Sequence, residues 1–138
     1  MSSPIRIGLD LGGTDPKAVA LDPEGAVLRF VRVPSRADDG PEGPIDAMRT
    51  AFDQVRLANE TASTVGLGCP GAIDPTTGAL RGTTPHLPHW KGIPIGARAG
   101  AALGHTVHVE NDATCAAWAE HRLGAARGTR VSFTVTIG

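Results

Sequence analysis

Three short apolar runs, separated by tight turns, open the sequence and constrain the fold more than any other feature. Residues 4–10, 17–22 and 26–33 each have the length of a strand and are too short for a typical helix. Between the second and third runs, Asp-Pro-Glu-Gly at 22–25 places proline and glycine where a type I turn prefers them. The three runs therefore predict an antiparallel meander.

Helices and strands are predicted to alternate in the rest of the chain. Apolar side chains at 45, 48, 52 and 55 recur at spacings of three and four, which predicts a helix over about 43–60. The further expected elements are strands at 63–69, 105–110 and 130–138, a small hairpin within 70–82, and helices at 93–104 and 112–123. Asn111 is the predicted N-cap of the last helix and Gly124 its end. This order predicts a mixed α/β sheet with helices on its faces.

The composition is that of an ordinary globular protein, with 41% hydrophobic and 20% charged residues in 138. The 13 Lys+Arg and 14 Asp+Glu residues leave a net charge of -1, so neither nucleic acid nor an anionic membrane is an expected partner. No apolar run has the length of a secretory leader or a membrane span, so we expect a cytoplasmic protein. Cys69 and Cys115 form no CxxC or Cys/His motif, and we expect two reduced, partly buried thiols.

The first candidate site is the stretch Gly-Leu-Asp-Leu-Gly-Gly-Thr-Asp-Pro-Lys that begins within the first predicted strand. Asp10 ends the strand, and Gly12 and Gly13 allow backbone N–H groups to approach an anion closely. Thr14 adds a hydroxyl and Lys17 a positive charge, as in a phosphate-binding loop. The stretch is neither a Walker A sequence nor a G-x-G-x-x-G fingerprint, and a plain hairpin turn is the alternative interpretation.

The second candidate site is the start of the predicted helix at 112–123. Asp112 falls in its first turn, where the helix dipole favours an ionised carboxylate that could accept a proton from a substrate hydroxyl. A capping acid is the alternative interpretation, and Glu110 and Asn111 carry the same ambiguity. Small side chains are expected to pack this helix closely onto the sheet; they are Ala113, Ala116, Ala117 and Ala119.

The third candidate site is the loop region that follows the predicted strand at 63–69. Pro70-Gly71 fits the centre of a type II turn, which leaves backbone groups free beside the strand end. Further along, His86, His89 and Trp90 are predicted to line a pocket, because the face of a tryptophan packs well on a sugar ring. Two histidines without a third ligand are weak evidence for zinc.

Taken together, these segments resemble the ROK family of sugar kinases and sugar-responsive repressors, within the hexokinase/actin-like superfamily. The resemblance rests on D-x-G-G-T-x-x-K at 10–17, P-G-x-x-D at 70–74 and E-N-D-A-x-x-A-A at 110–117, and it spans nearly the whole chain in order. It implies the ribonuclease H-like N-terminal lobe of an actin-like ATPase at 1–128, with element order βββαβαβα. Residues 129–138 would be the first strand of a C-terminal lobe that the chain otherwise lacks.

The resemblance also implies roles for individual residues. The loop that would hold the phosphates of Mg-ATP consists of Asp10, Gly12, Gly13, Thr14 and Lys17, with Asp10 near the metal ion. The residues that would contact a hexose are Gly71, His86, Glu110, Asn111 and Asp112. Asp112 would be the catalytic base that activates the C6 hydroxyl of the sugar for attack on the γ-phosphorus. Polyphosphate is the alternative phosphoryl donor, and the zinc motif of the family has no counterpart in this sequence.

Two features of the sequence depart from the family pattern. Asp15 and Pro16 stand within the phosphate loop, where they add a negative charge and remove a backbone donor. His86 stands where glucokinase-like members usually carry an asparagine that binds the sugar, and the neighbouring Thr-Thr-Pro resembles the fructokinases of the family. The identity of the hexose therefore stays open.

Family members are considerably longer than 138 residues, so we expect the isolated chain to be incomplete and inactive as a kinase. The alternative functions are a non-catalytic sugar-binding remnant and the sugar-sensing module of a ROK transcriptional repressor. The expected partners are a hexose and a nucleotide. A homodimer, or self-association through the unpaired terminal strand, is the expected protein contact.

Overall fold

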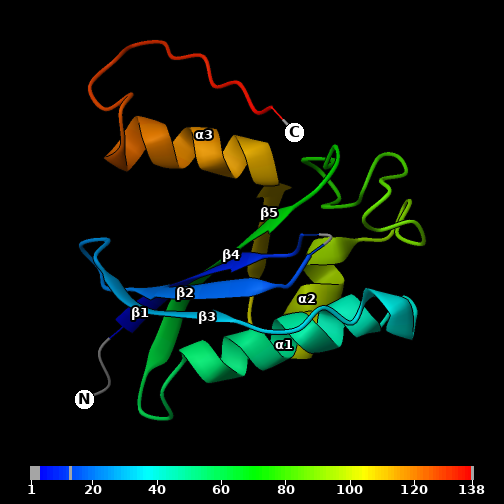
Figure 1. Ribbon diagram of the computed structural model, residues 1–138. Coiled ribbons are helices and arrows are strands. Elements are labelled where there is room, and N and C mark those ends of the chain that lie inside the picture. Colours follow the sequence, from blue (N-terminus) through cyan, green and yellow to red (C-terminus); the bar gives the residue numbers. More distant parts are fainter. Residues whose placement is uncertain (1–3, 13, 138) are drawn as a thin grey trace.

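A five-stranded mixed sheet organises the fold in the computed structural model, which describes residues 4–12 and 14–137 (Figure 1). Its strands are β1 (Pro4–Asp10), β2 (Lys17–Leu21), β3 (Val27–Arg32), β4 (Thr61–Cys69) and β5 (Val107–Asn111). They lie in the order β3-β2-β1-β4-β5. The first three form the predicted antiparallel meander, and β4 and β5 run parallel to β1. The predicted mixed sheet is confirmed.

The helices lie on both faces of this sheet. They are the short 3-10 helix η1 (Ala37–Asp39) and the α-helices α1 (Gly43–Val55), α2 (Ile95–Leu103) and α3 (Asp112–Leu123). α1 and α2 cover one face, and α3 lies over the opposite face (Figure 1). α3 has the predicted bounds, with the Asn111 side chain accepting a hydrogen bond from Thr114 N and Gly124 at the C-cap. Across the described ranges, no helix has the length and apolar character needed to cross a bilayer.

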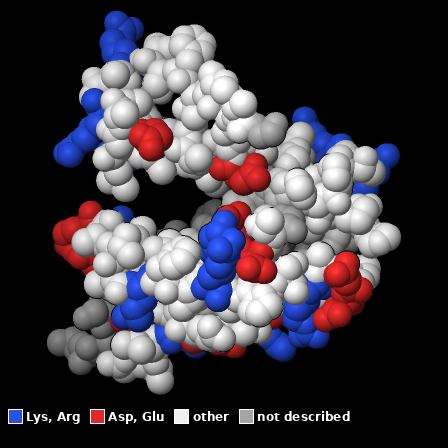
Figure 2. All heavy atoms as spheres, viewed as in Figure 1, with Lys and Arg blue, Asp and Glu red and all other residues white. Residues whose placement is uncertain are grey.

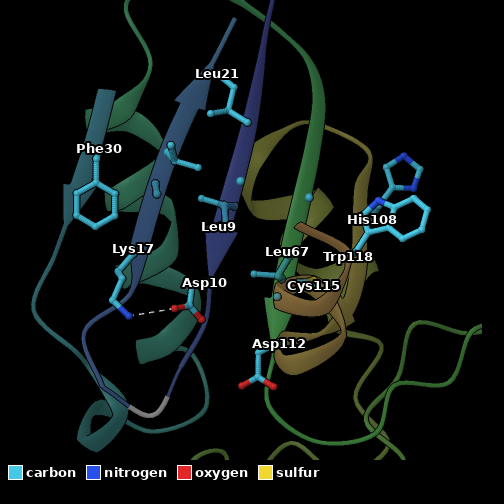
Figure 3. Close-up of a pocket in the computed structure, with 15 residues that line it drawn as sticks. Leu9, Asp10, Lys17, Leu21, Phe30, Leu67, His108, Asp112, Cys115 and Trp118 are labelled. Carbon is cyan, nitrogen blue, oxygen red and sulfur yellow. Dashed lines mark hydrogen bonds and ion pairs between the residues drawn. The ribbon is translucent and has the colours of Figure 1, made fainter. Parts of the chain in front are cut away.

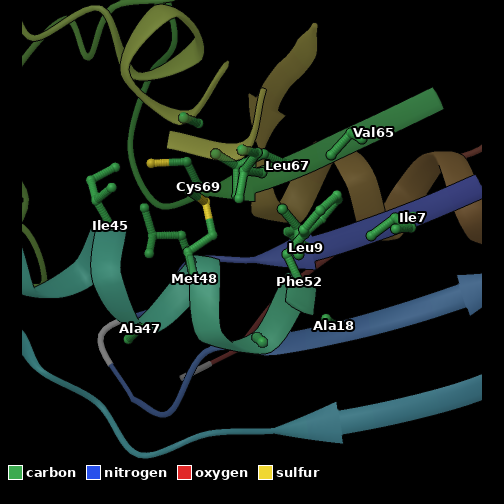
Figure 4. Close-up of a cluster of buried hydrophobic side chains, with 14 of the residues drawn as sticks. Ile7, Leu9, Ala18, Ile45, Ala47, Met48, Phe52, Val65, Leu67 and Cys69 are labelled. Atoms are coloured by element: carbon green, nitrogen blue, oxygen red, sulfur yellow. The ribbon is translucent and has the colours of Figure 1, made fainter. Parts of the chain in front are cut away.

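The hydrophobic core lies between the sheet and the pair α1 and α2 (Figure 4). Side chains of a strand alternate between its two faces, so every second residue of β1, and of β4 from Val65 onward, points into this layer. Leu9 and Leu67 are buried there together with Met48 and Phe52 of α1. The apolar stripe predicted for this helix at 45, 48, 52 and 55 is buried at all four positions, which confirms its packing role.

α1 ends at Val55, earlier than the predicted end near residue 60. Arg56 takes an extended backbone conformation, and the chain then turns toward β4. The Glu60 carboxylate accepts a hydrogen bond from Leu57 N and pairs with Arg29 of β3, which also donates to Val55 O. These contacts satisfy the end of the helix and tie it to an edge strand, so another helical turn is not formed.

The sheet face under α3 is largely uncovered. α3 has no buried residue in its 12 positions, and Cys115 and Trp118 line the space between the helix and the sheet (Figure 3). The prediction that the alanine stripe packs this helix onto the sheet is wrong, since Ala116 and Ala119 are exposed. A set of alanines in the sequence indicates that a helix has small side chains, but it does not show which element packs against them. α3 approaches the sheet at its start, beside Gly68.

Two further expectations change in the loops. The hairpin predicted within 70–82 is reduced to an isolated antiparallel bridge between Ile73 and Leu80. The strand predicted at 130–138 is not formed in the described part of the chain, where 131–137 has no regular structure and Phe133 is exposed. A strand needs hydrogen bonds from a neighbouring strand, and the apolar alternation of this segment has no such neighbour here.

Candidate active site

Asp10 and Lys17 form an ion pair where β1 and β2 leave the sheet. The two residues are register partners in the antiparallel ladder, and Asp10 Oδ2 lies 3.1 Å from Lys17 Nζ. Both side chains keep more than a third of their surface exposed, 42% for Asp10 and 36% for Lys17. The pair therefore presents a carboxylate and an ammonium group together at the edge of the uncovered sheet face (Figure 3).

The loop after β1 is anchored at its first residue and narrow at its second. Leu11 is fully buried, and its N–H donates to Gly68 O at 2.9 Å. A Cβ added to Gly12 would lie 3.7 Å from Asp10 Oδ1 and 3.8 Å from Thr14 Oγ1. A side chain at this position would fill the space between the carboxylate and the hydroxyl. Gly13, predicted to donate its backbone N–H to a phosphate, lies outside the described residues.

Asp15 and Pro16 connect this loop to the end of β3. Asp15 Oδ1 accepts a hydrogen bond from Ser35 N at 3.0 Å, and Asp15 Oδ2 lies 3.4 Å from Arg32 Nε. Pro16 is buried, and its carbonyl accepts a hydrogen bond from Val33 N at 3.0 Å. The negative charge of Asp15 is thus paired with Arg32. That Asp15 adds a negative charge to the loop stays a prediction, with Arg32 now identified as its ion-pair partner.

Asn111 holds the start of α3 and the position of Asp112. Its Oδ1 accepts a hydrogen bond from Thr114 N at 3.0 Å, and its Nδ2 donates to Gly71 O at 2.9 Å and to Asp112 Oδ1 at 3.1 Å. Asp112 Oδ1 also accepts from Ala113 N at 2.8 Å. One amide side chain therefore caps the helix, joins it to the loop after β4 and orients the neighbouring carboxylate.

Gly71 is required by the turn that Asn111 contacts. Its φ of +92° agrees with the positive φ that the third position of a type II turn requires. A Cβ at this position would lie 2.6 Å from Leu80 Cδ1, well inside contact distance. A larger residue would be strained in its backbone and would also collide with the buried Leu80.

Gly68 brings the two candidate sites together. It is the register partner of Asp10 in the parallel β1–β4 ladder. A Cβ added to Gly68 would lie 3.6 Å from Asp112 Cα and 3.7 Å from Cys115 Sγ. Asp10 and Asp112 therefore stand on either side of a residue without a side chain, with their carboxylates facing the same space (Figure 3). Segments far apart in the sequence meet at this glycine.

Both cysteines lie close enough to the site carboxylates for their pKa values to be affected. Burial raises the pKa of Cys69 to about 12, with smaller contributions from the charges of Asp112 and Asp10. The pKa of Cys115 is also raised, by burial first and then by Glu110, Asp112 and Asp10. Both cysteines are free, and the expectation of two reduced, partly buried thiols agrees with Cys69 being buried and Cys115 half-buried.

The sequence matches the family described as ROK over residues 6–138. The chain belongs to the ROK family. It is 34% identical over 136 residues to the glucokinase of Streptomyces coelicolor, an alignment that covers 97% of this chain and 41% of that protein. The chain therefore spans about two fifths of the length of this ROK relative, corresponding to its N-terminal part.

Solved sugar-kinase structures share the fold of this chain. The inorganic polyphosphate/ATP-glucomannokinase of an Arthrobacter strain superimposes with a TM-score of 0.81 at 32% identity, over 92% of this chain and 51% of that chain. The ROK glucokinase of Streptomyces griseus, solved in complex with glucose and AMPPNP, gives 0.78 at 32% identity, over 90% and 38%. The five-stranded sheet is therefore that of the N-terminal lobe of ROK proteins within the actin-like ATPase fold.

The structure brings three of the ten predicted site residues to one cavity, and the other described ones do not line it. Asp10, Lys17 and Asp112 line a cavity of about 580 Å³ between α3 and the open sheet face (Figure 3). Glu110 lies beside them, with its Oε1 accepting a hydrogen bond from Asn111 N at 2.7 Å. These residues come from three strands and one helix start, so the sheet order creates the grouping.

The pocket predicted from His86, His89 and Trp90 is not formed by these residues. Trp90 is 1% exposed and belongs to the hydrophobic core, which leaves no face of the ring for a sugar. His86 and His89 are exposed on the surrounding loop, and neither lines the cavity beneath α3. A loop rich in proline and glycine has few large side chains, and here the tryptophan anchors that loop to the core.

Sequence reasoning missed two features of the site. Gly68 carried a signal, because a glycine inside a strand marks a position that another group approaches closely. Arg32 and Ser35 carried none, since their contacts with Asp15 depend on the meander bringing the end of β3 beside the loop after β1. Local sequence contains no record of that approach.

Proposed function

We propose that this chain is the N-terminal lobe of an ATP-dependent hexose kinase, and that a C-terminal lobe of the kind found in its longer relatives completes the active site. The observation that carries the proposal is the placement of Asp10 and Asp112 on either side of Gly68. This puts a carboxylate from the loop expected to hold phosphates next to a carboxylate suited to a proton acceptor. The naming of the Streptomyces coelicolor relative as a glucokinase supports this assignment.

On the sugar side, Asp112 is the proposed catalytic base. Its Oδ1 is occupied by hydrogen bonds from Ala113 N and Asn111 Nδ2, so Oδ2 is the oxygen that would take the proton of the sugar hydroxyl. General base catalysis of this kind contributes roughly 10²–10⁴ in rate. Asn111, Glu110 and Gly71 adjoin Asp112 and are proposed sugar contacts, whereas His86 would reach a sugar only from its exposed loop.

On the phosphate side, the loop from Asp10 to Lys17 is the proposed cradle. Lys17 would place positive charge on a phosphate, and Gly12, Gly13 and Thr14 would supply backbone and hydroxyl donors. The carboxylate of Asp10 is an oxygen ligand of the type Mg²⁺ prefers. Because Gly12 has no side chain, the space between Asp10 Oδ1 and Thr14 Oγ1 is left for a ligand. When bound, Mg-ATP supplies the phosphoryl group and the metal charge that offsets the negative charge developing on it.

The name of the Arthrobacter structural relative favours polyphosphate as a second candidate donor. Polyphosphate and ATP present the same terminal phosphoryl chemistry to the loop at Asp10–Lys17. The two donors differ in the group attached to these phosphates, which is adenosine in ATP and further phosphate in polyphosphate. The adenosine-binding part of a C-terminal lobe would distinguish them. Donor choice is therefore proposed to reside outside this chain, with the base and the first phosphate contacts inside it.

A chimeric enzyme tests the kinase proposal. Residues 1–138 are joined to the part of Streptomyces coelicolor glucokinase that follows its matching segment, and ADP release is followed with glucose, fructose and mannose. We expect turnover with at least one hexose, and we expect Asp112→Asn to lower kcat by roughly 10²–10⁴. The 138-residue chain alone should show negligible turnover in the same assay.

Asp53→Asn is the matched control, because Asp53 lies on the exposed side of α1, away from the cavity. It makes the same chemical change and should leave kcat within twofold, roughly the range of a surface substitution. A folded chimera that phosphorylates none of the sugars, or one in which Asp112→Asn keeps full activity, would overturn the proposal.

A further inference from the structure

Four charged side chains lie side by side at the end of the sheet where the candidate phosphate loop begins. Asp10 is the register partner of Lys17, and Lys17 is the register partner of Arg32. Register partners on neighbouring strands point to the same face, so Arg32 of β3 shares the open face with Lys17. Asp15, from the loop, pairs with Arg32. Two cations therefore lie between two carboxylates. Figure 2 shows the cleft between α3 and the sheet open to solvent, with basic and acidic atoms next to one another at its closed end.

Lys17 and Arg32 are directly opposite each other in the closer kind of antiparallel pair. The next pair along is the hydrogen-bonded one, since Val33 N donates to Pro16 O at 3.0 Å. The two kinds of pair alternate along a ladder, so Lys17 and Arg32 are a non-hydrogen-bonded pair, with Cα atoms about 4.5 Å apart. Like charges at directly opposite positions destabilise a sheet. An anion that contacts both cations removes this repulsion, so the position favours a negatively charged ligand.

The ion pair between Arg32 and Asp15 is exposed and longer than a charge-assisted hydrogen bond. Arg32 Nε lies 3.4 Å from Asp15 Oδ2, against about 2.7–2.9 Å for such a bond. The Arg32 side chain is 56% exposed and that of Asp15 45% exposed, so water and salt screen the pair and it contributes little to stability. Asp15 Oδ1 accepts a hydrogen bond from Ser35 N at 3.0 Å, which fixes the carboxylate in the loop. Asp15 therefore holds Arg32 in place and leaves its guanidinium open to a second anion.

We propose that Arg32 is a second phosphate-binding residue beside Lys17, and that the ligand of this pair of cations is a chain of two or more linked phosphates. The inference rests on the proposed function, in which Lys17 contacts one phosphate of the donor. Consecutive phosphates carry consecutive negative charges, which two adjacent cations match. The guanidinium group presents several N–H donors in one plane and binds phosphate oxygens in pairs. ATP and inorganic polyphosphate share this chemistry.

Titration of the 138-residue chain with inorganic tripolyphosphate tests the inference without turnover. The Nε–H signal of Arg32 in a two-dimensional ¹H–¹⁵N NMR spectrum is the one that disappears in Arg32→Lys, and it should move with added tripolyphosphate at constant ionic strength. Such spectra detect millimolar affinities, so binding by one lobe is measurable. Followed by backbone signals, Arg32→Ala should weaken binding about two- to fivefold, the range of one exposed ion pair, and Arg32→Lys should weaken it less.

Asp15→Asn separates a binding role of Arg32 from a structural one. The amide oxygen still accepts the hydrogen bond from Ser35 N but carries no charge. Because a competing negative charge is removed, Asp15→Asn should tighten tripolyphosphate binding about two- to fivefold, opposite in sign to Arg32→Ala. A pair that only holds the loop gives a different result, in which both substitutions weaken binding and the double variant is no worse than either. That result would overturn the inference.

Arg49→Ala is the matched control. The Arg49 side chain is 57% exposed and pairs with Asp46 on α1, which packs on the covered face of the sheet. The substitution removes the same charge and a similarly exposed ion pair, so it should leave tripolyphosphate binding unchanged. Unchanged circular dichroism spectra of all variants confirm that they are folded. A wild-type chain that binds no tripolyphosphate, or binds it equally well in Arg32→Ala, would also overturn the inference.

The chimeric kinase distinguishes the two sources of linked phosphates. Arg32→Ala should raise KM for Mg-ATP about two- to fivefold, with KM for the hexose unchanged, and should weaken competitive inhibition by tripolyphosphate by a similar factor. A change in inhibition alone identifies the inorganic chain as the ligand, and a change in neither contradicts the role of Arg32. A chimera without turnover counts against the proposed function, whereas the NMR titration decides the role of Arg32 independently.

Discussion

The two faces of the sheet are built from the same strands and have opposite character. In β4, Leu67 points into the core under α1 and is fully buried, while its neighbours Gly66 and Gly68 face α3 with no side chain at all. In β1, Leu9 is buried and Asp10 reaches the candidate active site. Adjacent residues of one strand thus serve different purposes: those on the covered face stabilise the core, and those on the open face form the candidate site.

This division explains why the candidate active site lies where it does. The covered face is packed tightly with apolar side chains. These core residues come from the strands, from α1 and α2, and from the loop before α2. The open face keeps glycines at its centre, which lets Asp112 approach the sheet next to Asp10. The comparison predicts large stability effects on one face and small ones on the other.

The largest expected effect is on the covered face. Phe52→Ala should lower the free energy of unfolding by about 3–5 kcal/mol, because the ring is 2% exposed and its removal leaves a cavity. Phe30→Ala, the same substitution on the open face, should change it by less than about 0.5 kcal/mol, because that ring is 60% exposed. Urea unfolding followed by circular dichroism measures both. Equal losses would break the distinction between the faces.

The thiols on the two sides of the sheet should also differ in reactivity. A pKa raised from 9.0 to about 12 lowers the thiolate fraction of Cys69 about a thousandfold near neutral pH, before burial limits access further. Cys115 is half-buried beside the open face and should react first with a disulfide reagent, more slowly than a free cysteine because its pKa is also raised.

We expect one thiol to react in the native chain and the second only in urea. Cys115→Ser should remove the native-state reaction, which assigns it to the open face. Rapid labelling of Cys69 in the folded Cys115→Ser variant would contradict the buried position of Cys69 beneath the covered face.

A smaller effect is expected where the open face meets the loop after β4. Gly71→Ala should cost roughly 1–3 kcal/mol, because alanine is strained at a φ of +92° and its Cβ would collide with Leu80. Gly78→Ala is the matched control, with φ also positive and its nearest neighbour 3.8 Å from an added Cβ. Its loss of stability, from thermal unfolding, should be clearly smaller; a larger loss would mean that the contact with Leu80 does not matter.

The smallest expected effect is a pH dependence at the edge of the covered face. The hydrogen bond from Arg29, followed by one from Leu57 N, holds the pKa of Glu60 below its usual 4.5. Because the folded pKa is lowered, this stabilisation is present above pH 4.5 and is lost as the pH falls through the folded value.

Glu60→Gln should therefore be less stable than the wild type at neutral pH, and the difference should shrink as the pH falls below 4.5. Urea unfolding at a series of pH values measures the difference. Glu24→Gln, in the exposed β2–β3 turn, is the control and should show no such trend. A difference for Glu60→Gln that is constant across this range would contradict the role of its charge.

Most helices and strands were predicted close to their observed positions, because their signals are local; the small hairpin at 70–82 and the strand at 130–138 were the exceptions. Asn111 and Gly124 bracket α3 at its observed ends, and the turn at 22–25 separates β2 from β3. α1 was predicted too long because Glu60 ends it through contacts with Arg29 on another strand. Errors in length arose where a distant strand supplied the terminating contact.

The candidate site was predicted residue by residue but not as an arrangement. Asp10 and Asp112 could be identified from their segments, yet their meeting at Gly68 follows from the parallel pairing of β1 with β4. Trp90 was misplaced because an isolated tryptophan has the same sequence signal in a sugar pocket and in a core. Periodicity likewise shows that a helix has an apolar or small face, and only packing shows what covers that face.

The contacts of Asp15 and Pro16 join the loop after β1 and the end of β3 into one structural unit. Asp15 needs Arg32 for its charge and Ser35 for its hydrogen bond, and the carbonyl of Pro16 needs Val33 N. Anyone transplanting this loop between relatives must carry the exit of β3 with it. A graft of residues 10–17 alone would leave Asp15 without its counter-charge at the proposed mouth of a phosphate site. A graft that also includes residues 32–35 would keep these contacts.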